Sequence, residues 1–521
     1  MTTPETRGSL AYNPRMPGQI LESMDSQDPS LVAAVDLGSN SFHLLVGRVE
    51  QTPVGPQIIP IDSLKDAVRL ASGLSPDKRL DAASQARALG SLARFGERLR
   101  ALHPDHVRAV ATNTFRVAKN GPEFLQTCEA ALGFPIEVIA GKEEARLIYN
   151  GVAHSLAADG SRRLVVDIGG GSTEFIIGTD YTPEMLESVF VGCIRFTHDY
   201  FPGGEVTRNG FKEAVLEARR EIQVISQAYR KMGWDQAVGS SGTAKAITEM
   251  QIAMGETHQG LTRDGMEQIR SALIRERTLE PEKFPGVKPE RLQVLPGGLS
   301  IMLAIFEELG LEQMQYSDGA LRLGVLYDVL GRGRKDDMRY YTVSQFMDRY
   351  GVDAAQAERV SAMALSLWEA AAVGSMEERR EMAMLIGWAC QLLEVGHSIS
   401  HNSYHKHSAY IVSNADMPGF SRRDQRVMST FVLGHVGKLA KVQPGLGTES
   451  QRLALVCIRL AAIFYRNRSK AKLPQIAVGQ RGRKLSITID AEWLKRHPLT
   501  RHSLEQECSE WRKVGVELEV V

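Results

Sequence analysis

The sequence predicts an α/β protein in which two related domains precede a helical segment and a small α+β unit. An apolar run that ends in an aspartate and a Gly/Ser turn occurs at 31–49 and again at 164–178, which places Asp36 and Asp167 at matching positions 131 residues apart. Amphipathic helical patterns follow both copies. From about residue 332, Ala-, Met- and Leu-rich helical patterns take over. A duplicated α/β architecture with a helical addition accounts for these observations together.

The expected elements follow from local patterns. Each repeat is predicted as a strand, a tight turn and a second strand, because β-branched and aromatic residues flank a Gly/Ser/Asn break. We expect helices at 85–102 and 213–232, a strand-to-helix turn at 237–247, turns of small residues before amphipathic helices at 296–310 and 316–330, a charged linker at 331–339 and a strand at 484–490. The expected segments are a disordered tail at 1–28, α/β domains at 29–150 and 151–331, a helical domain at 332–472 and an α+β domain at 473–521.

Length and composition exclude several classes of protein. The 521 residues exceed the roughly 250–300 at which a single core stops growing. The 62 basic and 62 acidic residues balance, so no global field attracts nucleic acid or a membrane. Five scattered cysteines without a CxxC pair argue against disulfides and zinc and fit a reducing cytoplasm. The first 28 residues lack the apolar core of a signal peptide, and no apolar stretch is long enough to span a bilayer.

The glycine turns are suited to phosphate. Successive glycines at Gly169, Gly170 and Gly171 expose backbone N–H groups that form an anion-binding nest. Ser172 and Thr173 add hydroxyl donors, whereas Asp167 suits a hard divalent cation because a carboxylate repels phosphate. The alternative is a tight turn in which Asp167 is only a capping residue. Two copies of the turn, plus a third glycine turn at 237–247, favour a phosphate site.

Six ordered motifs carry a resemblance to a known family. The stretches "AAVDLGSNSFHLLV", "ATNTFRVA", "GKEEARLIYNGV", "VVDIGGGSTEFIIG", "GSSGTAKAI" and "SDGALRLGVL" resemble the exopolyphosphatase and guanosine pentaphosphate phosphohydrolase family. The resemblance implies two ribonuclease H-like domains of the actin, sugar kinase and Hsp70 superfamily that close on a phosphate cleft. It also implies a helical domain similar to HD-type phosphohydrolases, and a homodimer.

Glu144 is the expected catalytic base. On a helix, "AGKEEARLIYNGVA" forms an apolar stripe of Ala145, Ile148, Tyr149 and Val152. Glu144 lies one turn before Ile148 and is expected to face inward, and the resemblance assigns the base to the same position. Glu143 lies on the more polar side and is expected to be a solvated partner. The alternative is that Glu144 is a surface residue paired with Arg146.

The remaining ligands are expected around the turns. Asp167 and Glu174 lie seven residues apart across a hairpin, close enough to meet one cation, and the resemblance implies Mg²⁺ there, with K⁺ stimulation left open. Asp36 is either a further acid of the cleft or a brace for its own turn. Arg116 resembles the family's phosphate-contacting arginine and can bind phosphate through two N–H groups. Asn40 and Ser41 complete the predicted cradle.

A histidine-rich stretch allows two interpretations. His397, His401 and His405 would lie along one face of a helix, a spacing that suits metal binding. The resemblance argues against it, because the metal-binding His-Asp pair of HD-type enzymes appears here as Leu393-Glu394. We therefore expect a channel for polyphosphate, with a solvated basic face as the alternative. Its expected residues are His401, His405, Lys406 and His407, with Arg466, Arg468, Lys470 and Lys472 nearby.

The leading functional hypothesis is a cytoplasmic exopolyphosphatase that releases orthophosphate from the ends of inorganic polyphosphate. The alternative is a guanosine pentaphosphate (pppGpp) 5′-phosphohydrolase that gives ppGpp, and one protein can have both activities. The stretch "DIGGGS" favours polyphosphate, because the guanosine branch often resembles "DIGGAS". A kinase of the same superfamily would need an adenosine pocket, for which only "GSSGTAKAI" is available. A non-catalytic polyphosphate or nucleotide sensor is a more distant alternative.

Overall fold

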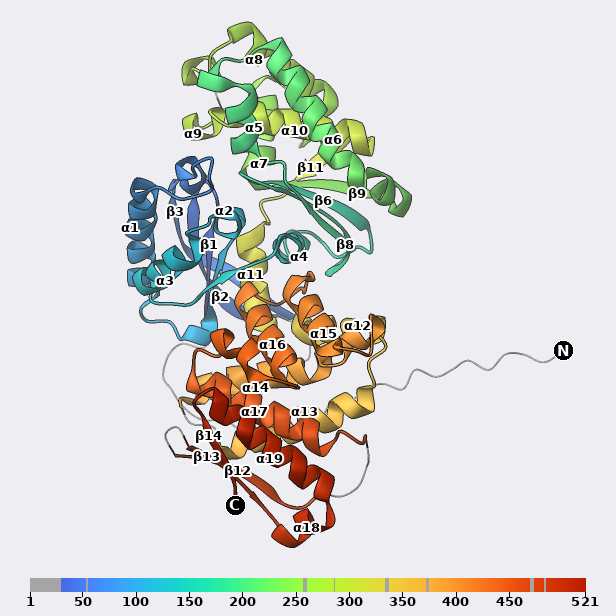
Figure 1. Ribbon diagram of the computed structural model, residues 1–521. Coiled ribbons are helices and arrows are strands. Elements are labelled where there is room, and N and C mark those ends of the chain that lie inside the picture. The colour runs from blue at the N-terminus through green and yellow to red at the C-terminus, as the bar shows by residue number, and fades with distance from the viewer. Residues whose placement is uncertain are drawn as a thin grey trace, which may run out of the picture.

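The computed structural model describes residues 30–52, 55–255, 260–284, 286–332, 337–371, 374–468, 473–481 and 484–521. The expected tail at 1–28, part of the linker at 331–339 and the residues Lys470 and Lys472 lie outside the described residues. Two α/β units, each built on its own sheet, are followed by a largely helical region (Figure 1).

The first sheet has the strand order β3-β2-β1-β4-β5. Strand β1 pairs antiparallel with β2 and parallel with β4, as expected for a hairpin followed by a crossover. Helices α1 and α3 cover one face, where Leu92 and Phe124 join a core with Val35 and Phe42. The strands are β1 (Leu31–Leu37), β2 (Phe42–Thr52), β3 (Gly55–Asp66), β4 (Val107–Ala111) and β5 (Ile136–Val138). The helices are α1 (Ala82–Leu99), α2 (Asn113–Val117), α3 (Gly121–Leu132) and α4 (Gly141–Ala153).

The second sheet has the same arrangement of strands as the first sheet. Its order is β10-β11-β9-β6-β7-β8, so that without the short β10 it reads as the same topology, with β6 in the place of β1. The register repeats too: Asp36 pairs with His43, and Asp167 pairs with Glu174. The predicted duplication is thereby confirmed. The strands are β6 (Arg162–Ile168), β7 (Thr173–Thr179), β8 (Thr182–Val189), β9 (Gln236–Ser240), β10 (Leu261–Thr262) and β11 (Gln313–Tyr316).

Helices of the second unit cover the face of its sheet that is remote from the first unit (Figure 1). Phe211 and Ile222 of α6 share this core with Leu299 of α10 and Phe175 of β7. The predicted turns at 237–247 and 316–330 are confirmed by β9 followed by α7, and by β11 followed by α11. The turn expected at the start of 296–310 is wrong, because α10 already begins at Leu295 and includes the Pro-Gly-Gly stretch. The helices are α5 (Cys193–Tyr200), α6 (Arg208–Met232), α7 (Ser241–Ala253), α8 (Arg263–Glu276), α9 (Pro289–Leu292), α10 (Leu295–Leu309) and α11 (Leu321–Gly331).

Helices α4 and α11 lie between the two sheets. Their side chains Ile148 and Val325 share one buried core with Val110 of the first sheet and Val165 of the second. Because sheets contact α4 from both sides, ten of its thirteen residues are buried, far more than a single apolar stripe would give. This position places the first turn of α4 beside both glycine turns.

The region after α11 is built around one core. Trp368 of α13 and Ile458 of α17 share that core with Ile487 of β13 and Trp511 of α19, so the last strands and helices pack directly on the helical bundle. Among the described residues, no helix is both long and apolar enough to cross a membrane. The elements are α12 (Met338–Arg349), α13 (Ala354–Ala371), α14 (Met376–Leu392), α15 (Tyr404–Asn414), α16 (Arg422–Gly434), α17 (Glu449–Phe464), β12 (Ile476–Arg481), β13 (Lys484–Ile489), α18 (Ala491–Arg496), α19 (Pro498–Lys513) and β14 (Glu517–Val520).

Candidate active site

The two glycine turns face each other across the boundary between the α/β units. A Cβ atom added at Gly170 would lie 3.2 Å from Ser39 Cβ, in the turn of the first unit. A Cβ atom at Gly171 would lie 1.9 Å from Asn113 Nδ2, at the start of α2. The glycines are therefore needed for close approach of the two units as well as for backbone exposure. In the part of the chain that the structure describes, the amides of Gly170 and Gly171 donate to no carbonyl, whereas Gly169 donates to Ser172 O.

Four carboxylates lie close together next to these turns. Asp36 and Asp167 occupy matching positions on β1 and β6, Glu174 lies opposite Asp167 on β7, and Glu144 comes from α4. Burial raises the pKa of Asp36 to about 7 against the opposing effect of Arg322, and raises that of Asp167 to about 6. Burial, then the charges of Glu144 and Asp167, raise the pKa of Glu174 well above its usual value. Such crowding of buried carboxylates is typical of functional sites.

Glu144 is hydrogen-bonded to Arg116, the residue expected to bind phosphate. Arg116 Nη1 donates to Glu144 Oε2 at 2.7 Å and to the backbone carbonyl of Ile139 at 3.1 Å. Glu144 is 8% exposed, as expected for an inward-facing residue, and its partner is Arg116, so the alternative of a surface glutamate paired with Arg146 is wrong. A carboxylate and a guanidinium that both lie beside the glycine turns can act on water and on a phosphoryl group.

Three buried polar atoms around the cleft have no partner among the described residues. They are Asp36 Oδ1, Asn113 Oδ1 and Arg116 Nη2. Buried polar groups are nearly always hydrogen-bonded, so three such atoms in one place indicate groups arranged for a ligand. The two acceptors suit a cation or a hydroxyl group, and the guanidinium N–H suits a phosphate oxygen.

The first turn is organised by a histidine. Arg322 Nη1 donates to His43 Nδ1 at 2.8 Å, which leaves His43 Nε2–H to donate to Ser41 Oγ at 2.8 Å. The Ser41 hydroxyl therefore keeps its own hydrogen for a further acceptor, and Asn40 precedes it in the same turn. Burial, then the charges of Arg322 and Lys65, lower the pKa of His43 to about 2, so the ring is neutral.

Sequence reasoning missed two arginines at the cleft. Arg322 lies at the start of α11, within the quoted motif "SDGALRLGVL". Arg291 lies over the third glycine turn, where a Cβ atom at Gly242 would be 2.4 Å from Arg291 Cζ. For Arg322 the duplication offered a signal through His43, its hydrogen-bond partner. His43 occupies the position in the first unit that Glu174 holds in the second, which marks it as a site residue. Arg291 has no comparable local signal.

The hydroxyl groups of the second turn are used differently from what the sequence predicts. Thr173 is fully buried, and its hydroxyl donates to the carbonyl of Val191 at 2.7 Å. The expectation that Thr173 offers a hydroxyl donor to phosphate is therefore wrong, since this bond holds the turn against the segment between β8 and α5. Ser172 is 2% exposed and its hydroxyl bonds to Glu174, whose Oε1 also accepts from Ser188 Oγ at 2.8 Å.

The donor set fits a magnesium ion. Among the described residues, no group of three or more His, Cys, Asp or Glu side chains is arranged to hold a metal by itself. Mg²⁺ is usually held by one or two carboxylates, with substrate phosphates and water completing its octahedron. The Asp167–Glu174 pair meets that requirement, and the unpartnered Oδ1 of Asp36 offers a further oxygen.

Glu143 is buried, so its predicted role as a solvated partner is wrong. It is 1% exposed and accepts from Arg146 Nε at 2.8 Å and from Arg108 Nη2 at 3.3 Å. The helical period correctly separated Glu143 from Glu144. The polar side of the helix is nevertheless covered, because α11 and the helical region pack over it.

The histidine stretch does not form one continuous helix. A short 3₁₀ turn spans Val395–Ser398, and α15 begins only at Tyr404, after Ser403 in the left-handed region at φ 57°. The expected single face with three imidazoles is therefore wrong. His397 stacks on His401 and on Tyr404, with ring centroids 5.1 and 4.0 Å apart.

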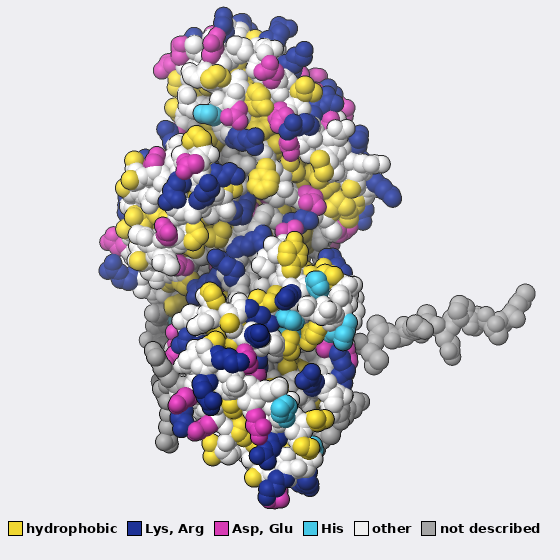
Figure 2. All heavy atoms as spheres, in the orientation of Figure 1, with side chains coloured by type: hydrophobic (Ala, Val, Ile, Leu, Met, Phe, Trp, Pro, Cys, Tyr) yellow, Lys and Arg dark blue, Asp and Glu magenta, His cyan; other side chains and the backbone are white. Residues whose placement is uncertain are grey.

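The proposed polyphosphate channel residues lie on the helical region. Figure 2 shows histidine side chains together with Lys and Arg on one face of it. Lys406 and His401 are exposed, His405 and His407 are half-buried, and Arg466 is exposed. Arg468 is paired with Asp353 and Glu394, so its charge is already compensated. Burial, then Lys441 and Lys406, lower the pKa of His405 to about 4.

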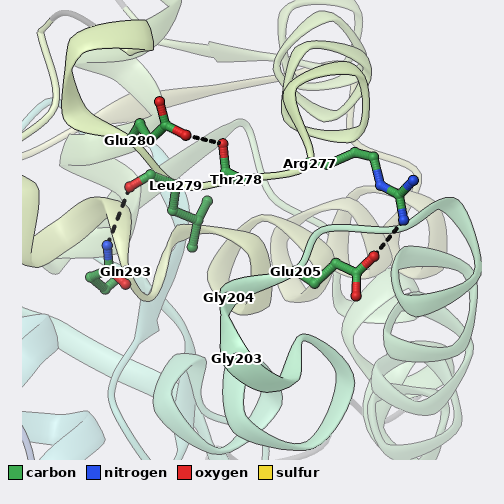
Figure 3. A pocket seen from close by; sticks show the side chains of 8 residues that line it. All are labelled: Gly203, Gly204, Glu205, Arg277, Thr278, Leu279, Glu280 and Gln293. Atoms are coloured by element: carbon green, nitrogen blue, oxygen red, sulfur yellow. Dashed lines mark hydrogen bonds and ion pairs between the residues drawn. The ribbon is translucent and has the colours of Figure 1, made fainter.

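A hollow of about 460 Å³ on the second unit contains none of the predicted site residues (Figure 3). Its polar side chains bond to one another: Arg277 pairs with Glu205, and the Thr278 hydroxyl donates to Glu280. Because none of the expected acids, arginines or glycines lies there, the chemistry is assigned to the facing turns. The lining residues are Gly203, Gly204, Glu205, Arg277, Thr278, Leu279, Glu280 and Gln293.

Comparison with known proteins agrees with this geometry. The family model of the Ppx/GppA phosphatase family matches residues 49–333, and that of Ppx/GppA phosphatase domain III matches 338–508. The guanosine-5′-triphosphate,3′-diphosphate pyrophosphatase of Vibrio vulnificus is 36% identical over 93% of this chain and 97% of its own length. That of Pseudoalteromonas translucida is 36% identical over 94% and 98%.

Among solved structures, an exopolyphosphatase from Cytophaga hutchinsonii shares the fold, with a TM-score of 0.52 and 24% identity over 59% of this chain and 99% of that one. The fold is thus the actin- and sugar kinase-like arrangement of two mixed α/β sheets, here with a helical C-terminal region. With both family models matched in order and the relatives alike over nearly their whole length, the chain belongs to the Ppx/GppA phosphatase family.

Proposed function

We propose that the protein hydrolyses the terminal 5′ phosphoanhydride bond of guanosine 5′-triphosphate 3′-diphosphate. The observation that carries this proposal is the similarity to relatives named for that substrate, which spans 93–94% of this chain, helical region included. The leading expectation from the sequence, polyphosphate, rested on a few short stretches, "DIGGGS", "SISHNSYHKHSAYIV" and "SDGALRLG", that resemble the exopolyphosphatase branch, and whole-length similarity outweighs them.

The chemistry follows from the cleft. The oxygen of a water molecule attacks the terminal phosphorus, Glu144 takes the proton of that water, and the bond to the bridging oxygen breaks, releasing orthophosphate and ppGpp. Arg116 has an unpartnered Nη2–H for a phosphate oxygen while Nη1 remains on Glu144. One guanidinium would thereby hold the base and the phosphoryl group at a fixed separation.

The glycine turns and the acids have separate tasks in this proposal. Gly170 and Gly171 present amides to the equatorial oxygens, and Ser41 donates its remaining hydrogen from the opposite turn. Asp167 and Glu174 would hold Mg²⁺, with substrate phosphates and water as its other ligands. When bound, the ion neutralises charge that develops on the phosphate oxygens.

Hydrolysis of polyphosphate is retained as a second candidate because of the cations at the start of α15. Lys406 and Lys441 both act electrostatically on His405, so these three groups lie close together. A local positive cluster of this kind favours a longer polyanion than a single nucleotide. The effect of this cluster on the rate of phosphate release should appear only with long polyphosphate chains.

The test is phosphate release with Mg²⁺ from pppGpp and from long polyphosphate, compared at equal terminal-phosphate concentration. We expect faster release from pppGpp, and we expect Glu144→Gln to abolish release while leaving substrate binding by calorimetry intact. Glu123→Gln, at an exposed position on α3, is the matched control and should retain activity. Faster release from polyphosphate would instead support exopolyphosphatase as the main activity. Binding without release from either substrate would favour a sensor.

A further inference from the structure

Glu143, the residue before the proposed base, joins α4 to the rest of the molecule. Its Oε1 accepts from Arg146 Nη2 at 2.9 Å and from Arg108 Nη2 at 3.3 Å. Its Oε2 accepts from Arg146 Nε at 2.8 Å and from the backbone amide of Gly419 at 2.8 Å. Four hydrogen bonds therefore fix a carboxylate that is 1% exposed.

The arginines extend this contact into a larger network. Arg108 of β4 and Arg146 of α4 both donate to Asp328 of α11, and Arg108 also pairs with Glu137 of β5 at 3.0 Å. Arg332 bonds to Glu137 at 2.7 Å, which makes three arginines and three carboxylates in all. A charge-balanced, largely buried network in which every charge is paired is rigid. Removing one of its charged side chains strongly destabilises the folded protein.

The helical region bonds to Glu143 through the loop between α15 and α16. The loop Asp416–Gly419 lies between α15 and α16, and the Gly419 amide is its contact with Glu143. Asp416 Oδ2 lies 3.6 Å from Lys142 Nζ. Two consecutive residues of the first turn of α4, immediately before Glu144, are therefore bonded to the same loop.

The loop is held firmly by its own region. The Thr342 hydroxyl donates to the carbonyl of Pro418 at 2.7 Å, and Phe420 is buried against Trp388 with ring centroids 5.0 Å apart. Gly419 adopts φ +89°, and a Cβ atom there would lie 2.8 Å from Arg339 Cγ. The position therefore requires glycine, because any side chain is strained in this backbone conformation and would push the loop away from Arg339.

We propose that the loop Asp416–Gly419 positions the base Glu144 by holding Glu143 and Lys142, so that docking of the helical region controls turnover. This inference rests on the proposed role of Glu144. The phosphate-binding glycines lie on the hairpin turns of the sheets, whereas Glu144 lies on the turn that the loop holds. Displacement of the loop should thus misplace the base and leave the phosphate cradle intact. Glu143 is a positioning residue in this scheme.

The test compares Gly419→Ala with Gly351→Ala in the full-length protein. Gly351 also has a positive φ, +62°, but a Cβ atom there meets nothing within 4 Å, so it reproduces the backbone strain without the contact. We expect Gly419→Ala to lower kcat about ten- to hundredfold with KM unchanged, because misplacing a reacting group by about 1 Å has that effect. Gly351→Ala should keep kcat while losing a similar amount of thermal stability.

Hydrogen exchange provides a second readout that needs no substrate. Amides in the first turns of α4 should lose protection in Gly419→Ala and keep it in Gly351→Ala. An unchanged kcat in Gly419→Ala, or an equal fall in both variants, would overturn the proposal. If the wild type releases no phosphate from pppGpp or polyphosphate, the proposed function fails. Hydrogen exchange then tests the coupling by itself, and α4 protection that is unchanged in Gly419→Ala would overturn it.

A variant at an exposed side chain covers the case in which Gly419→Ala does not fold. Asp416→Asn removes only the pairing with Lys142, from a side chain that is 44% exposed. We expect kcat to fall by about two- to fivefold, the size of one partly exposed ion pair, with KM unchanged. A kcat equal to that of the wild type would contradict the proposal in that case.

Discussion

Arg116 and Glu144 share a hydrogen bond of 2.7 Å, and the second terminal nitrogen of the same guanidinium is buried without a partner among the described residues. The proposed base is thus held by one arm of the arginine while the other arm is free to bind. A planar fork with two donors can do this, whereas a point charge cannot. The relationship links the position of the water-activating carboxylate to the position of the phosphoryl group.

The first prediction concerns this fork. Arg116→Lys should lower kcat/KM for pppGpp by about ten- to hundredfold, because the ammonium group cannot hold Glu144 and phosphate in the same geometry. Steady-state phosphate release measures the effect. Arg94→Lys, which changes an exposed arginine paired with Asp66, should remain within twofold of the wild type. Near-normal activity in Arg116→Lys would show that the fork is not used.

The second prediction concerns the close approach of the two units. In Gly171→Ala the new methyl group would overlap Asn113 Nδ2, so the turns must separate and kcat should fall at least tenfold. Adding Asn113→Ala makes room for the methyl group and should restore part of the lost activity. Gly90→Ala, whose Cβ would meet only Arg94 Nη1 at 3.8 Å, is the control and should have no effect on turnover. If the double variant is no better than Gly171→Ala, steric separation is not the cause.

The local part of the site could be predicted from the sequence. A hairpin places residues of opposite strands side by side, so the spacing of Asp167 and Glu174 was sufficient to pair them, and the structure confirms that pairing. The repeated strand–turn–strand pattern likewise predicted both sheets, because each hairpin is formed by neighbouring residues. Glu144 followed from the helical period of α4.

The non-local part could not be predicted in the same way. The helical period placed Glu143 on a polar face, but the burial of that face depends on Asp328 and Gly419, 185 and 276 residues further along the chain. Arg291 reaches the third glycine turn from a short helix whose place no local pattern specifies. The break before Tyr404 depends on the left-handed conformation of Ser403, for which serine gives little signal.

The third prediction concerns the cost of burying the acids. Burial and the charges of Glu144 and Asp167 raise the pKa of Glu174, so its ionised form destabilises the metal-free protein at neutral pH. Glu174→Gln should therefore raise Tm by a few degrees in EDTA. Mg²⁺ should stabilise the wild type and have little effect on the variant. A lower Tm for the variant in EDTA would mean that the Ser188 hydrogen bond outweighs the charge repulsion.

The fourth prediction concerns a buried histidine in the helical region. His435 Nδ1–H donates to the carbonyl of Val432 at 2.7 Å, and its Nε2 accepts from the Tyr404 hydroxyl at 2.9 Å, so the ring is neutral. Burial lowers the pKa of His435 to about 3, and His405, Arg459 and Lys441 act in the same direction. In the unfolded chain the pKa is about 6.5.

The sign of the pH effect follows from these two values. Above about pH 6.5 the ring is neutral in both states, and its contribution to stability is fully present. As the pH falls from 6.5 toward 3, the unfolded chain binds a proton that the folded protein excludes, so this contribution is lost at about 1.4 kcal/mol per pH unit. Thermal unfolding between pH 8 and pH 4.5 should therefore show a smaller fall in Tm for His435→Gln than for the wild type.

The comparison is one of slopes, because His435→Gln also loses packing and should have the lower Tm at pH 8. His405 titrates in the same direction, since its pKa is lowered to about 4, and it stays in place in the variant. His502→Gln changes an exposed histidine on α19 and should leave the slope of the wild type unaltered. Parallel curves for His435→Gln and the wild type would mean that the buried ring takes up its proton without unfolding, which its two hydrogen bonds oppose.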